Sequence, residues 1–371
     1  MVSAGHVRRP IAPPRSTPLS TATPVPVTAA ARHPVPRRSL RVRRLTGLVL
    51  LLAALVACCL LSVAVGAKPI PLMTVWDALV RPDVTLEDHI VVRSLRIPRT
   101  VLGLIVGAAL GLAGALIQGH TRNPLADPGI LGVNAGAAFL VVVGIYVFGV
   151  TDALGYVWFA FAGAAVASVA VFVLGAVGRG GATPVTLALA GAAVSALLSA
   201  LTSAIILIDV ATLDAYRYWA VGSLAGRDGE VLTNVVWFLA AGALIALASA
   251  PALNALSLGD DVARSLGHSV KRTRVLGIVA ITLLAGGATA ACGPISFVGL
   301  VVPHVVRTFT GPDYRWLLPA SALSGSVLLL LGDVVGRVVV RPGELQVGIV
   351  LALVGAPFFI YLVRRRKMVS L

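Results

Sequence analysis

Residues 275–306 read VLGIVAITLLAGGATAACGPISFVGLVVPHVV and contain no Asp, Glu, Lys or Arg. An α-helix rises 1.5 Å per residue, so this run would be roughly 48 Å long as one helix, whereas the hydrocarbon core of a bilayer is about 30 Å thick. Gly293-Pro294 interrupts the run, and proline breaks a helix because it lacks an N–H group and clashes with the preceding turn. We therefore predict two short helices that meet at this dipeptide.

Further uncharged runs fill most of the chain on both sides of this stretch. A helix that spans the hydrocarbon needs about 20 apolar residues, so each run is a candidate span. With the two halves of the split run, they predict an all-α polytopic membrane protein with about ten transmembrane helices. The other runs are 45–67, 100–121, 128–151, 153–178, 180–208, 231–259, 316–332 and 345–363.

The composition supports lipid as the main solvent. Of 371 residues, 58% are hydrophobic and 12% are charged, and a soluble domain of this size needs more charge to cover its surface. The formal net charge is +15. That excess lies mostly in two tails, residues 1–44 and 364–371, which argues against a nucleic-acid partner.

The tails also set the expected orientation. Residues 1–44 are rich in Pro and Arg and have no hydrophobic periodicity, which predicts a disordered basic tail ahead of a transmembrane permease domain at 45–363. Positive segments stay in the cytoplasm, so an even number of spans places both termini there. The links near 122–127, 179–184, 259–274 and 307–315 are then cytoplasmic, and those near 68–95, 209–230 and 336–344 are external.

Several kinds of catalytic and energy-coupling chemistry are missing from the chain. Its three lysines, Lys68, Lys271 and Lys367, stand in no phosphate-binding loop. No carboxylate lies in the middle of a predicted span; Asp209 and Asp333 sit at ends, where Asp333 can pair with Arg337 one turn on. Proton-coupled carriers usually bury an ionisable group at mid-depth. We therefore expect no catalytic residue, metal site or cofactor, and a separate energy source. A stand-alone channel or secondary transporter remains the alternative.

Specific blocks of sequence resemble the FecCD/BtuC-type permeases of importers for ferric siderophores, haem and cobalamin. They follow the family's order and are most similar to ferric-enterobactin permeases. The blocks are RIPRT at 96–100, RNPLADPGILGVNAG at 122–136, LNALSLGDDVARSLG at 253–267, GPISFVGLVVPH at 293–304, GEL at 343–345 and GAP at 355–357.

The resemblance implies a type II ABC importer permease in the bacterial inner membrane that translocates an iron–siderophore complex. Its partners would be a pair of ATP-binding subunits, a second permease subunit, identical or paralogous, and an extracytoplasmic siderophore-binding protein. ATP hydrolysis would belong to the separate subunits. Haem or cobalamin is the alternative substrate within the family.

The resemblance also assigns roles to individual positions, each with a simpler structural explanation. Residues 259–267 match the coupling helix that docks on the ATPase, although a plain amphipathic surface helix would have the same pattern. Three arginines match residues that face acids of the binding protein, although cations also snorkel at membrane interfaces. The gate positions include Asn123-Pro124, which equally reads as a helix stop. The coupling residues are Gly259, Asp260, Asp261, Val262, Arg264, Leu266 and Gly267; the docking residues are Arg96, Arg99 and Arg337; the gate residues are Asn123, Leu125, Thr183, Pro184 and Val185.

Overall fold

The computed structural model describes residues 37–177, 183–227 and 229–364. The predicted tails therefore fall largely outside the described residues. Residues 37–44, which the composition assigns to the N-terminal tail, instead form the first turns of helix α1. The apolar run that follows them continues the same helix.

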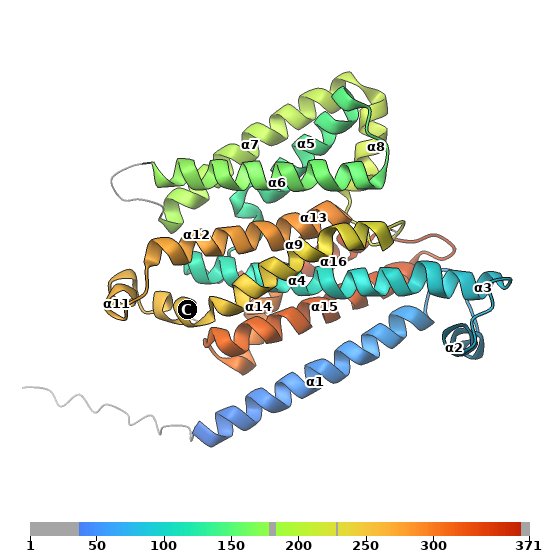
Figure 1. The fold of residues 1–371 in the computed structure, drawn as a ribbon, viewed down its shortest axis with the longest axis horizontal. Coiled ribbons are helices and arrows are strands. Elements are labelled where there is room, and N and C mark those ends of the chain that lie inside the picture. The colour runs from blue at the N-terminus through green and yellow to red at the C-terminus, as the bar shows by residue number, and fades with distance from the viewer. Residues whose placement is uncertain (1–36, 178–182, 228, 365–371) are drawn as a thin grey trace, which may run out of the picture.

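Every regular element in the described part of the chain is helical (Figure 1). The α-helices are α1 (Arg37–Ala64), α2 (Leu72–Val80), α3 (Glu87–Ile90), α4 (Ile97–Thr121), α5 (Val133–Phe148), α6 (Ala153–Ala176), α7 (Pro184–Ile208), α8 (Val210–Ala220), α9 (Gly229–Ala248), α10 (Ala250–Ser257), α11 (Asp260–Ser265), α12 (Val270–Ile281), α13 (Gly287–Cys292), α14 (Val298–Thr310), α15 (Tyr314–Val339) and α16 (Val347–Arg364). Two π-helical segments, η1 (Val91–Arg96) and η3 (Thr282–Gly286), and a 3-10 turn, η2 (Pro128–Leu131), complete the order.

The helices confirm the predicted polytopic fold. Among the described residues, 7 helical stretches are long and apolar enough to cross a membrane, and three shorter apolar helices lie at 133–148, 298–310 and 347–361. The second span is longer than its uncharged run, because helix continues without a break from Glu87 to Thr121 through η1. The predicted external link at 68–95 is thus partly folded into α2, α3 and η1.

The break predicted at Gly293-Pro294 is confirmed. Helix α13 ends at Cys292, Gly293 adopts a φ of +75°, and α14 begins only at Val298. The free Cys292 carbonyl accepts a hydrogen bond from the Ser223 backbone N–H at 2.7 Å. A neighbouring loop therefore satisfies the backbone where the span is interrupted.

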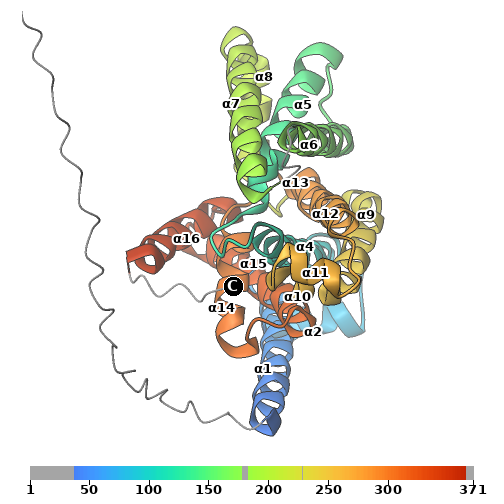
Figure 2. The same cartoon turned by 90° about the vertical axis from the view of Figure 1, so that its left-hand side faces the viewer.

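Helix α4 forms the centre of the bundle, and α15, α14, α12 and α9 surround it (Figure 2). Its contacts with α15 and α14 depend on glycine, since a Cβ at Gly107, Gly111 or Gly114 would overlap the backbone of the neighbouring helix. Lipid gives no hydrophobic drive for helix association, so such backbone-to-backbone packing is the main attractive contact. The fold thereby fixes the two ends of α4, where the candidate sites lie.

Candidate functional site

The predicted coupling segment forms a short helix with glycine at both ends. Helix α11 covers Asp260–Ser265, and Gly259 and Gly267 have φ values of +118° and +83°. At the C-terminus the Gly267 and His268 N–H groups donate to the carbonyls of Arg264 and Ala263. This is the Schellman arrangement that glycine favours, because it has no Cβ to clash in the left-handed region.

The two faces of α11 differ sharply. Ala263 on the inner face is fully buried and packs with Ala255, Leu256 and Val270. On the outer face Val262 and Leu266 are 42% and 59% exposed. Two apolar side chains held outward on a rigid, capped helix form a surface that a partner protein can cover.

The charged residues of α11 also divide between the faces. Asp261 is almost fully exposed, and among the described residues its ion-pair partner is Arg264 along the helix, at 2.6 Å. Asp260 points inward and contacts the Arg122 and Arg274 guanidinium groups. The sequence alone does not predict these two contacts of Asp260, because Arg122 lies 138 positions away from it and Arg274 lies 14 positions away.

The predicted gate positions lie at two helix ends on the same side of the bundle as α11. Asn123 follows the C-cap of α4, and its Oδ1 accepts a hydrogen bond from the Leu125 N–H at 2.9 Å. Thr183 caps α7 through a reciprocal pair of hydrogen bonds with Thr186, and Pro184 occupies the first turn.

A small cavity joins these two helix ends. Thr121 of α4 and Pro184 of α7 both line it, together with His120 and Arg274. Asn123, Leu125, Thr183 and Val185 are not among its lining residues. The structure thus brings the two predicted gate segments near one another, but only Pro184 faces the shared space.

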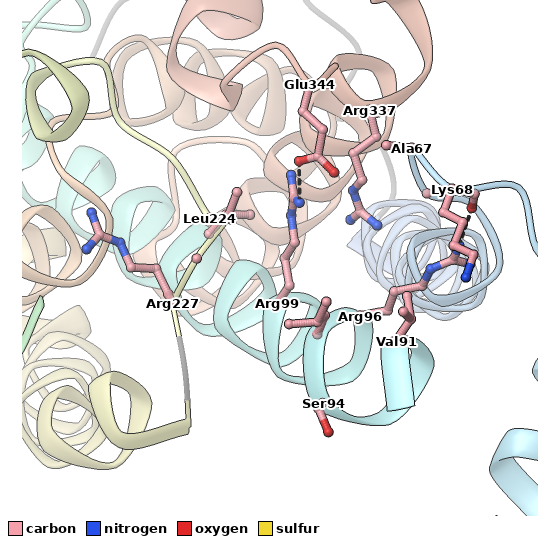
Figure 3. Close-up of a pocket in the computed structure, with 14 residues that line it drawn as sticks. Ala67, Lys68, Val91, Ser94, Arg96, Arg99, Leu224, Arg227, Arg337 and Glu344 are labelled. Atoms are coloured by element: carbon pink, nitrogen blue, oxygen red, sulfur yellow. Dashed lines mark hydrogen bonds and ion pairs between the residues drawn. The ribbon is translucent and has the colours of Figure 1, made fainter. Parts of the chain in front are cut away.

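A second cavity, of about 630 Å³, opens at the opposite end of α4. Its lining carries five cationic side chains and one carboxylate: Lys68, Arg96, Arg99, Arg227, Arg337 and Glu344. Figure 3 shows Arg99, Arg337 and Glu344 grouped on one side, with Arg227 across the space beyond Leu224. All three predicted docking arginines therefore line this pocket, which we call the external arginine pocket because the predicted topology assigns it to the outside of the membrane.

Two of these arginines share a buried carboxylate. The Asp333 side chain is 0% exposed and accepts hydrogen bonds from both Arg99 and Arg337. Arg99 also binds Glu344 at 2.6 Å, and Arg337 donates to the Ser62 and Val65 carbonyls. The predicted Asp333–Arg337 pair is confirmed, but Arg99 as a second partner was not foreseen.

Arg96 is fixed differently, by backbone carbonyls. Its guanidinium donates to the Val63, Ala64 and Lys68 carbonyls at 3.0, 2.7 and 2.6 Å, and the residue is 4% exposed. The side chain thereby caps the C-terminal end of α1, a position that favours a cation. Nearby, hydrogen bonds to Asp88 and Glu87 raise the pKa of Lys68.

Arg307 is a buried cation that the sequence does not predict. The uncharged runs assign it to a cytoplasmic link, but it lies in the last turn of α14 and is 2% exposed. Its Nη1 donates to Gln118 Oε1 at 3.3 Å. The residues around Arg307 in the sequence do not distinguish it from an arginine at the membrane interface, because its hydrogen-bond partner, Gln118, lies in α4, far away along the chain.

Comparison with known proteins identifies the chain by family. Residues 54–365 match the FecCD transport family. The chain is 48% identical over 320 residues to the ferric enterobactin transport system permease protein FepD of Escherichia coli K12, covering 86% of this chain and 94% of that protein. It is 40% identical to the iron(3+)-hydroxamate import system permease protein FhuB of Bacillus subtilis 168, covering 86% of this chain and 84% of the relative.

A cobalamin relative and a solved structure agree with this assignment. The cobalamin import system permease protein BtuC of Halobacterium salinarum is 39% identical, with 82% of each chain covered. An inward-facing metal-chelate type ABC transporter matches with a TM-score of 0.75 and 31% identity, over 86% of this chain and 99% of that one. The resemblance drawn from the sequence blocks is confirmed: this chain belongs to the FecCD transport family of permeases.

Proposed function

We propose that the chain is the permease subunit of an ATP-binding-cassette importer that carries a ferric siderophore across the bacterial inner membrane. The observation that supports this most strongly is the 48% identity to a ferric enterobactin permease across nearly the whole of both proteins. Relatives named for iron hydroxamate and ferric citrate, each 40% identical, point to the same class of cargo.

The ATP-binding subunits dock on the outer face of α11. Val262 and Leu266 supply exposed apolar contact, and Asp261 with Arg264 supplies exposed charge. A partner that covers such a patch gains binding free energy from burying the apolar side chains, and the charges around the patch fix the orientation in which it binds. The chain itself performs no chemical step, so force from ATP binding enters the permease here. A second permease subunit, identical or paralogous, completes the transmembrane pathway.

The binding protein docks at the external arginine pocket through acidic side chains. Arg99 is the arginine that such an acid reaches, because its other partner, Glu344, is 32% exposed and replaceable. Arg96 and Arg337 are nearly buried and hold the mouth of the pocket in shape. A guanidinium can fork onto a carboxylate, so an incoming acid displaces Glu344 without leaving Arg99 unpaired.

The gate segments close the pathway on the side of α11. Asn123 and Leu125 continue from α4, and Thr183, Pro184 and Val185 begin α7. Both segments are anchored by hydrogen-bonded helix ends. A displacement of those ends therefore moves the segments as units. With both termini and α11 in the cytoplasm, this side is the exit for imported cargo.

Growth on single siderophores tests the substrate. A strain that lacks this permease should fail to use ferric enterobactin as its only iron source, and the wild-type gene should restore growth. A cobalamin importer is the second candidate, favoured by the 39% identity to a cobalamin permease. Normal use of ferric enterobactin and of other ferric siderophores, together with a defect on cobalamin, would select that alternative.

A further inference from the structure

The two neighbouring carboxylates of α11 differ in exposure and in the residues that they contact. Asp261 is 97% exposed at its side chain, whereas Asp260 is 26% exposed and lies between Arg122 and Arg274. Each carboxylate oxygen of Asp260 takes one guanidinium: Oδ1 binds Arg122 and Oδ2 binds Arg274 Nη2 at 2.7 Å. We call these three residues the Asp260 clasp.

Arg122 stands where the chain would ordinarily place glycine. It is the left-handed residue after α4, with φ 49° and ψ 32°. The Asn123 N–H donates to the Gln118 carbonyl and the Arg122 N–H to the Gly119 carbonyl, which is a Schellman cap. Glycine adopts this conformation without steric cost and arginine does not. The side chain of Arg122 therefore offsets an unfavourable backbone.

That side chain fastens α4 to the coupling region at two points. Besides the Asp260 carboxylate, Arg122 Nε donates to the Leu256 carbonyl at 3.0 Å, near the end of α10. The residue that follows Arg122 is Asn123, the first gate position. Only one peptide bond thus separates the clasp from the gate segment.

The second arm of the clasp holds a helix that already packs tightly on α4. Arg274 lies in α12, and α12 approaches α4 so closely at Gly277 that a Cβ there would overlap the His120 ring. Asp260 consequently joins two helices that pack against each other. Charge pairs at partly buried positions interact more strongly than an exposed pair does, because water and salt screen them less.

We propose that Asp260 is the positioning residue that transmits movement of the coupling helix to the gate, through Arg122 to Asn123 and through Arg274 to α12. This inference rests on the proposed coupling function of α11. The proposal separates two roles within α11: the residues of its outer face bind the ATPase, and Asp260 transmits the movement to the gate. Loss of Asp260 should therefore leave the ATPase bound but disconnect it from transport.

The test uses the complete importer in proteoliposomes, with the permease, its ATP-binding subunits, its binding protein and radiolabelled ferric enterobactin. Asp260→Asn should lower the iron transported per ATP hydrolysed by about tenfold, about 1.4 kcal/mol of coupling, while the ATPase still co-purifies. Arg122→Gly keeps the backbone cap and should show the same loss. Asp260→Glu should recover most of the ratio. Asp214→Asn, in an exposed ion pair of α8, is the matched control and should match the wild type.

Two results would overturn the proposal that the Asp260 clasp transmits movement to the gate. An Asp260→Asn or Arg122→Gly importer with wild-type transport per ATP shows that the gate does not depend on it. Loss of ATPase co-purification in parallel with transport assigns Asp260 to docking instead. Failure of the wild-type complex to transport ferric enterobactin is a different outcome, since it contradicts the proposed function and leaves these ratios undefined.

Discussion

Asp333 shows how a single side chain organises the end of the molecule that carries the arginine pocket. It is completely buried within α15, yet it carries a charge that two guanidinium groups neutralise. Breaking a buried ion pair on one side leaves the partners charged and unpaired, which costs more than the pair contributed. The carboxylate is therefore a structural requirement for the arginine pocket.

We expect Asp333→Asn to lower the free energy of unfolding by about 3–5 kcal/mol, because Arg99 and Arg337 lose their shared counter-charge. Thermal unfolding of the purified protein in detergent measures the change. Glu344→Gln removes a carboxylate that is 32% exposed and should shift the transition much less. Equal shifts in the two variants would show that the buried network is not the stabilising element.

The resemblance in sequence singled out three arginines that line one pocket, but it did not show their surroundings. Arg96, Arg99 and Arg337 line one pocket, which agrees with the prediction that all three lie at the same ends of their spans. The Asp333–Arg337 pair could be predicted from its spacing, but the Arg99–Asp333 pair could not, since 234 positions separate the two residues and they meet only after α4 and α15 have packed. Arg122 is a similar case: Asn123-Pro124 signals a helix end, but nothing local shows that Arg122 reaches α11.

Helices α4 and α15 associate through positions where side chains are absent. At Gly111 an added Cβ would overlap the Ser321 carbonyl, and at Gly107 it would meet the Gly325 backbone. Because the obstruction is backbone, it cannot rotate away. Glycine is therefore required here for interhelical distance and not for backbone conformation.

Gly111→Ala should lower the free energy of unfolding by about 1–3 kcal/mol, because one methyl group forces the two helices apart. Gly229→Ala is the matched control, since open space surrounds the first residue of α9. Thermal unfolding and the yield of folded protein compare the two variants. If both behave alike, the close approach of α4 and α15 does not govern stability.

Substitutions on the outer face of α11 should weaken binding of the ATPase without lowering the stability of the permease. Val262→Asp and Leu266→Asp should weaken ATPase binding about tenfold or more, since each apolar side chain contributes about 1.5–3 kcal/mol when fully buried by a partner. Neither should lower the unfolding temperature, because both side chains are exposed in the free permease. Affinity co-purification and thermal unfolding give the two readings.

Val84→Asp supplies the control for this pair. Val84 is 84% exposed and lies at the other end of the molecule, near α3. The ATPase should bind this variant as it binds the wild type. Undiminished binding to the α11 variants would remove the helix from the ATPase interface.

The helices themselves were largely predictable from hydropathy, and their ends were not. Uncharged runs located the ten apolar helices of the described part of the chain, and proline with glycine located the break before α14. The span that begins at Glu87 extends past its uncharged run, because Asp333 neutralises Arg99 and backbone carbonyls hold the buried Arg96. Composition cannot show such compensation, which arises only from tertiary contacts.

At the scale of the whole molecule, the ten apolar helices among the described residues predict that both termini lie on the same side of the membrane. Cysteine accessibility tests this arrangement in a background that lacks Cys58, Cys59 and Cys292. A cysteine at Thr85 should react with an impermeant reagent added outside intact cells. A cysteine at Ser265, on α11, should react only after the membrane is opened. Reaction of Ser265→Cys from outside would invert the topology and place α11 beyond reach of cytoplasmic ATPases.

ATP-driven uptake by the reconstituted importer tests the central claim most directly. Proteoliposomes that contain the permease and its ATP-binding subunits, supplied with the binding protein, should accumulate ferric enterobactin only when ATP is present on the α11 side. Omission of ATP or of the binding protein should abolish accumulation. Uptake of ferric enterobactin by the permease alone, or ATP-driven uptake of cobalamin in its place, would contradict the account.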